Sequence, residues 1–148
     1  MKRLIRNILI AIGAAFLLAQ AQLLLDSKYI LIFLDRNLVS LLIALLAINS
    51  ASLGIVLSKI RELLDSDNGT HDFSKTKNEM LFSIKEQIVL IFLSLVLLMI
   101  NDSKWLLTHA KLISLIEMAV ITCFTYAMIV LSDTARSIFV VLSFKRNG

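Results

Sequence analysis

Hydrophobic positions in this chain gather into long apolar blocks separated by shorter polar stretches. The four blocks cover approximately residues 4–25, 38–58, 84–100 and 112–132. With its flanking residues, each block is long enough to cross the roughly 30 Å hydrocarbon core of a bilayer at about 1.5 Å per helical residue. The pattern therefore predicts an all-α integral membrane protein, a four-helix bundle that forms one membrane domain over residues 1–148.

The polar segment between the second and third blocks, residues 59–86, is predicted to be a helical hairpin tip. The apolar i, i+3, i+4 spacing of the second span continues to Leu64, so that helix is expected to extend about two turns into water. A polar stretch ending at Gly69 is typical of a helix stop, and Asp72 or Thr76 is the expected N-cap of the next helix. The hairpin tip should stand outside the bilayer.

Two segments leave alternatives open. The first block resembles a cleaved signal peptide at Ala19-Gln20-Ala21, but its apolar run continues through Leu25, so we expect an uncleaved span. Tyr29–Leu34 is too short to cross a bilayer and is expected to be a brief connection at the outer interface, with Tyr29 at headgroup depth. The patch 137–144 either extends the fourth helix onto the hairpin or lies along the lipid surface.

Lysine and arginine are unevenly distributed between the two sides of this topology. The richer side has eleven: Lys2, Arg3, Arg6, Lys59, Arg61, Lys75, Lys77, Lys85, Arg136, Lys145 and Arg146. The other side has four: Lys28, Arg36, Lys104 and Lys111. This positive-inside bias predicts that both termini and the hairpin tip face the cytoplasm. In the tail 133–148, which follows the fourth span, Asp133 and Arg136 have the i, i+3 spacing of an ion pair. The alternative is that the fourth span is shifted in register, so that both residues lie inside the membrane.

Composition excludes several classes of protein. The 148 residues are 58% hydrophobic, with a mean hydropathy of +0.86, beyond the range of soluble domains. The chain has no proline and four glycines, which favours uninterrupted helices over the broken helices of many transporters. The single cysteine, Cys123, cannot form an internal disulfide, and His71 and His109 fall on opposite sides of the membrane. We expect no enzyme, cofactor, metal or nucleic acid, since no catalytic or nucleotide motif is present.

Polar side chains within the spans are the candidates for chemistry, because hydrocarbon solvates them poorly. Glu117 lies about one and a half turns into the fourth span. We expect it to be a structural hydrogen-bonding group between helices or a carboxylate that reaches the interface, with a proton-relay or ion-pathway role as the alternative. Gln20 and Gln22 lie at similar depth on the first span, and either could hydrogen-bond to Glu117. Asn49, midway along the second span, is expected to hydrogen-bond between helices or subunits, with a pore-lining position as the alternative.

Small residues at four-residue spacing mark expected helix contacts. One row is Ala11, Ala15 and Ala19, and the other is Ser50, Gly54 and Ser58. Such rows let two backbones approach closely, either within a chain or between copies. Because a bundle this small can enclose little space, we expect a homo-oligomer.

The charged hairpin is the expected docking surface for a cytoplasmic protein. Its candidate residues are Lys59, Arg61, Glu62, Asp65, Lys75 and Lys77. Basic and acidic side chains alternate there, which favours a protein partner over nucleic acid.

By layout, the chain resembles small four-span inner-membrane subunits of bacterial phage-defence systems, the Kiwa membrane component (KwaA) and RexB. The matching features are the basic start MKRLIR, the SKIREL exit of the second span and the tail FKRN. The resemblance implies a membrane sensor or anchor, or a depolarising effector, that works with a cytoplasmic partner. An oligomeric channel and a small transporter that uses Glu117 are the alternative functions.

Overall fold

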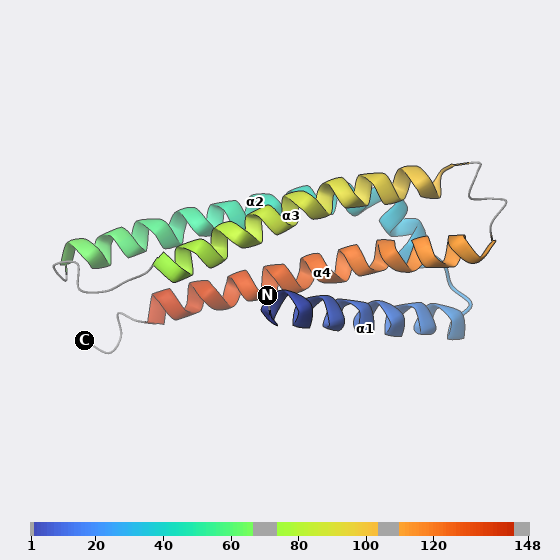
Figure 1. Cartoon of the computed structure of the whole chain (residues 1–148), viewed down its shortest axis with the longest axis horizontal. Coiled ribbons are helices and arrows are strands. Elements are labelled where there is room, and N and C mark those ends of the chain that lie inside the picture. Colours follow the sequence, from blue (N-terminus) through green and yellow to red (C-terminus); the bar gives the residue numbers. More distant parts are fainter. Residues whose placement is uncertain (1, 67–73, 104–109, 144–148) are drawn as a thin grey trace.

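Four helices make up the described part of the chain, which is residues 2–66, 74–103 and 110–143 of this computed structural model (Figure 1). They are α1 (Lys2–Leu24), α2 (Tyr29–Ser66), α3 (Ser74–Asn101) and α4 (Ala110–Ser143). Each contains a segment long and apolar enough to cross a membrane: Arg3–Leu24, Tyr29–Glu62, Lys77–Asn101 and Leu112–Arg136. The all-α prediction is confirmed, and the chain is a multi-pass membrane protein with four candidate spans.

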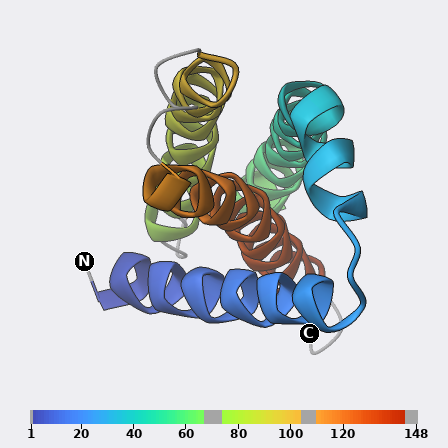
Figure 2. The same cartoon turned by 90° about the vertical axis from the view of Figure 1, so that its right-hand side faces the viewer.

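Helix α4 is the centre of the bundle. It packs against each of the other three helices, whereas the main contacts of α1 are with α4 alone. Within the most apolar window of each span, 44% of the α4 residues are buried, against 22% in each other span. Figure 2 shows α1 lying obliquely across one face of the bundle, from the side of α3 toward the start of α2. Most of the apolar surface of α1 to α3 is therefore left for lipid.

The α1–α4 crossing depends on small side chains. Ala11 and Ala15 are fully buried, and the Thr125 hydroxyl lies 3.1 Å from the Ala11 carbonyl oxygen, a close approach that larger residues would prevent. Around this crossing lies the main core, whose buried members also include Leu34, Leu38, Leu42, Leu90, Val120, Ile121, Cys123, Tyr126, Ala127 and Val130.

The start of α2 differs from the expected boundary at residue 38. Tyr29–Leu34 forms the first turns of α2, because the connection from α1 is tighter than the polar stretch suggests. Asp26 has a left-handed backbone (φ 46°), and Ser27 N donates to Gln22 O at 3.0 Å, which together form a Schellman-type helix end. Ser27 Oγ then accepts a hydrogen bond from Tyr29 N (3.2 Å) at the start of α2.

A second apolar cluster extends the bundle on the side where α1 begins. Its buried members, Leu53, Val56, Ile60 and Met80, pack with Leu57, Ile84 and Ile138. Ile138 belongs to α4, which continues to Ser143. Of the two alternatives for residues 137–144, the structure therefore has the first, in which the fourth helix extends onto the hairpin. At about 1.5 Å per residue, the 38 residues of α2 measure about 57 Å, well beyond a bilayer core of about 30 Å. Figure 1 shows α2, α3 and α4 running past the start of α1.

Candidate functional site

Two grooves flank α1 because it leans on α4 without extensive contact with α2 or α3. The first, which we call the α1–α3 groove, has a volume of about 440 Å³ and a lining from α1, α3 and α4. Its lining residues are Leu4, Ile8, Phe82, Lys85, Glu86, Val89, Leu90, Leu93, Thr122, Cys123 and Tyr126. The α4 residues form its floor, while α1 and α3 supply the walls.

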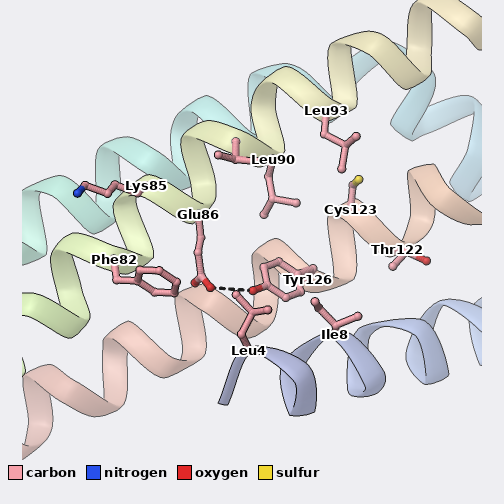
Figure 3. A pocket seen from close by; sticks show the side chains of 11 residues that line it. Leu4, Ile8, Phe82, Lys85, Glu86, Leu90, Leu93, Thr122, Cys123 and Tyr126 are labelled. Atoms are coloured by element: carbon pink, nitrogen blue, oxygen red, sulfur yellow. Dashed lines mark hydrogen bonds between the residues drawn. The ribbon is translucent and has the colours of Figure 1, made fainter. Parts of the chain in front are cut away.

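The α1–α3 groove contains one carboxylate in otherwise apolar surroundings. Tyr126 OH donates a hydrogen bond to Glu86 Oε1 at 3.0 Å (Figure 3). Thr122 Oγ1 donates to its own helix, to Met118 O at 2.8 Å, so its hydroxyl is already bonded. In Figure 3 the Lys85 ammonium points away from the Glu86 carboxylate. Glu86 is therefore the principal charge that faces the groove.

Glu86 is the functional candidate that the sequence interpretation missed. It falls in the segment 59–86 assigned to the polar hairpin tip, yet the α3 span begins at Lys77, which places Glu86 about 13 Å along it. Phe82, Glu86 and Val89 follow i, i+4, i+7 spacing on one face of α3, and that spacing is the signal that could have identified the groove wall.

A network of charges joins α1 to α3 and α4 beside this groove. Asp133 Oδ2 accepts hydrogen bonds from Arg3 Nε (3.1 Å) and from Asn7 Nδ2 (2.7 Å). Arg3 Nη1 also lies 3.6 Å from Glu79 Oε2. Asn7 is buried, and the Asp133 side chain is only 16% exposed. Because water screens such a pair weakly, this network fixes the start of α1 on the bundle.

The second groove, the α1–α2 groove, brings together three of the predicted intramembrane polar residues. Gln20, Gln22 and Glu117 all line a hollow of about 300 Å³ that also includes Asp26 and Lys28. Gln22 Nε2 donates to Ser27 O (3.2 Å), but the buried Gln22 Oε1 has no hydrogen-bond partner. Among the described residues, no hydrogen bond joins Glu117 to Gln20 or Gln22, so this predicted bond is not formed.

Glu117 also lines a smaller adjoining hollow of about 180 Å³, together with Lys28, Asp35 and Asn101. Asn101 Nδ2 donates to Asp35 Oδ1 at 3.3 Å, which links α3 to the start of α2. Charged and amide groups thus converge around Glu117 from three helices.

Asn49 lies in the interior of α2, with 1% of its surface exposed and both amide atoms lacking a hydrogen-bond partner in the described structure. Gln87 of α3 is equally buried and also lacks partners for both amide atoms. Ser83 and Ser94 on the same helix instead donate to the carbonyls of Glu79 and Leu90. Among the described residues, these two amides and Gln22 Oε1 are therefore the buried side-chain groups without a hydrogen-bond partner.

The two small-residue rows have different environments. Ala11 and Ala15 are buried and Ala19 is half-buried, but Ser50, Gly54 and Ser58 are exposed. A Cβ added at Gly54 would meet nothing within 4 Å. The second row therefore faces away from the bundle within one chain.

The predicted docking residues are partly engaged with one another. Lys59 pairs with Glu62 one turn away on α2, whereas Arg61 and Lys77 are exposed. The side chains of Asp65 and Lys75 lie outside the described residues. Arg61 and Lys77 are thus the described basic groups at this end of the hairpin that have exposed side chains.

Neither a search for metal sites nor a comparison with known proteins assigns a function to this chain. Within the described residues, no three His, Cys, Asp or Glu side chains are grouped to hold a metal ion. The predicted positions of His71 and His109 lie outside the described residues. Comparison with protein families, curated proteins and solved structures finds no match to this chain. Its assignment as a multi-pass membrane protein therefore depends on its own sequence and fold.

Proposed function

We propose that the protein is a non-enzymatic subunit of a bacterial inner membrane that oligomerises and docks a cytoplasmic protein through its central hairpin and its C-terminal tail, 133–148. The observation that supports this proposal is the second apolar cluster, in which Ile138 packs against α2 and α3 beyond the start of α1. A projection with its own core presents a fixed surface to a partner, which an unstructured loop does not. A role as sensor or anchor in phage defence is the specific form of this function.

Charge on the projection supports a protein as the partner. Arg61 and Lys77 are exposed, and Lys59 is held by Glu62, so the surface combines free basic groups with an internal ion pair. Exposed pairs of this kind contribute little to stability, roughly 0–1 kcal/mol, which leaves recognition as their more useful contribution.

The first experiment tests which side of the membrane the hairpin faces. In a Cys123→Ser background, single cysteines at Ser27 and Arg61 are labelled with a membrane-impermeant maleimide in intact cells. We expect labelling at Ser27 from outside, and at Arg61 only after permeabilisation. Labelling of Arg61→Cys in intact cells would invert the topology and remove the docking proposal.

Docking itself is tested by a photo-crosslinking amino acid placed at Arg61 or at Lys77 in cells that carry the neighbouring genes. We expect one defined cytoplasmic protein to be captured, and the double variant Arg61→Glu/Lys77→Glu to lose it. Lys28→Glu, at the other end of α2, is the matched control and should retain capture. Retained capture in the double variant would contradict the proposal.

A depolarising channel formed by several copies is the second candidate. The unpartnered amides of Asn49 and Gln87 favour it, since polar groups inside a span commonly line ion pathways. Ion flux through liposomes that contain the purified protein tests this function, with Asn49→Leu expected to abolish it. The absence of flux from the wild-type oligomer would eliminate the candidate.

A further inference from the structure

We propose that the α1–α3 groove is a binding site for a hydrophobic organic cation, which it holds against apolar walls through the Glu86 carboxylate. The groove is independent of the hairpin surface used for docking. Its volume of about 440 Å³ lies in the range of pockets that enclose small organic ligands.

The groove opens toward lipid, because several lining residues are exposed on the membrane-facing surface. Ile8 is 38% exposed, Phe82 51% and Val89 64%. A hydrophobic molecule dissolved in the bilayer can therefore enter sideways between α1 and α3. A strongly hydrated ion has no comparable entry here, since the residues around the opening are apolar.

Charge in and beside the groove selects a cation. Glu86, Glu79 and Asp133 bring three carboxylates to this end of the bundle, and Arg3 already binds Asp133 and lies near Glu79. Tyr126 donates to one oxygen of Glu86, while Oε2 receives no hydrogen bond from the described residues. Lys85 also lines the groove, but its ammonium points away from the Glu86 carboxylate (Figure 3), so an anionic headgroup beside Glu86 would be repelled, whereas a cation would neutralise the carboxylate.

Two aromatic rings strengthen this selection. Phe82 and Tyr126 lie on either side of the Glu86 carboxylate in Figure 3. The faces of aromatic rings attract cations, and the attraction grows where water is excluded. A carboxylate between two rings, with apolar walls around it, fits a delocalised or alkylated cation better than a neutral lipid chain.

Binding is measured on the purified full chain in detergent, with radiolabelled tetraphenylphosphonium as the probe in equilibrium dialysis. We expect saturable binding to the wild type, at least tenfold weaker binding to Glu86→Gln, and binding near the wild-type level for the charge-preserving variant Glu86→Asp. Glu117→Gln is the matched control, because it removes a carboxylate from the other groove, and it should bind as the wild type does.

A second variant tests the groove without changing its charge. Val89→Trp places a bulky ring at an exposed wall position and should weaken binding at least fivefold, with circular dichroism checking that the helices remain. The neutral probe triphenylphosphine oxide should not saturate. Wild-type binding by Glu86→Gln or Val89→Trp, or equal loss in Glu117→Gln, would overturn the proposal, as would unsaturable partitioning of the probe into every sample.

Discussion

The two ends of α1 meet the rest of the bundle in opposite ways. At its start, Arg3 and Asn7 both bind Asp133 of α4, and the buried polar atoms there have partners. At its end, Gln22 has a buried amide oxygen without a partner, and Glu117 of α4 forms no hydrogen bond with either nearby glutamine among the described residues. One helix therefore has a closed polar network at one end and an open polar groove at the other.

This difference shows that polar residues at membrane helix contacts can serve two purposes. A satisfied network stabilises one arrangement, because breaking it leaves buried groups without partners. Polar side chains without hydrogen-bond partners contribute little to stability, and they retain the capacity to bind a ligand. We therefore expect substitutions at the start of α1 to affect stability, and substitutions at its end to affect it little.

The largest effect is expected from Asp133→Ala, which removes the acceptor shared by Arg3 and Asn7. Asn7 would then be buried without this partner, and the free energy of unfolding should fall by about 2–3 kcal/mol. Unfolding is followed by circular dichroism during titration of mixed micelles with a denaturing detergent. Glu117→Gln is the control at the open end, and its loss should stay below about 0.5 kcal/mol. Equal losses in the two variants would abolish the distinction between the ends.

The next largest effect concerns the crossing point between the two ends. Ala15→Leu introduces a larger side chain at a fully buried position, and overpacking there should lower the free energy of unfolding by about 1–3 kcal/mol. Gly54→Ala on the exposed row is the comparison, since its added Cβ meets open space and helix propensity favours alanine by up to about 1 kcal/mol. The same micelle titration measures both variants. Destabilisation by Gly54→Ala would indicate that the second row is buried between copies of the chain.

Tyr126→Phe is expected to have an intermediate effect. It removes the hydrogen bond to Glu86 while keeping the ring, so the free energy of unfolding should fall by about 1 kcal/mol. Thermal unfolding in detergent is a sufficient measurement, with Phe82→Leu as a control that leaves the hydrogen bond intact. A stability unchanged from that of the wild type would mean that the carboxylate finds another donor.

The smallest effect is expected at the open end. Gln22→Leu removes the unpartnered amide oxygen together with the bond to Ser27 O, and these two changes oppose each other. The free energy of unfolding should therefore change by less than about 0.5 kcal/mol in either direction. A loss comparable to that of Asp133→Ala would show that the groove at this end is satisfied in the membrane.

The sequence predicted the fold class well because four apolar blocks of membrane length leave few other solutions. The predicted start of α2 was too late in the sequence, because Tyr29–Leu34 alone is too short to cross a bilayer. In the structure, the buried stripe of Leu34, Leu38 and Leu42 joins this segment to the rest of α2. Asp26 in a left-handed conformation allowed the tight turn, and nothing in its residue type makes that turn certain.

The candidate site was less predictable because it depends on which helices meet. Gln20, Gln22 and Glu117 were grouped correctly by depth alone, and they do line one groove. Glu86 was interpreted as part of a solvated segment, because it lies between two other polar residues, Lys85 and Gln87. Only the packing of Tyr126 beside it reveals that this carboxylate faces a membrane groove.

Helix α4 runs without interruption from Ala110 to Ser143, past Glu117, Tyr126, Asp133 and Ile138 in turn. At about 1.5 Å per residue, its 34 residues measure about 51 Å, so one unbroken helix links the end near Glu117 to the end near Ile138. A protein bound around Ile138 would therefore be connected to the carboxylate at Glu117 by continuous helix, over a distance close to the thickness of a bilayer core.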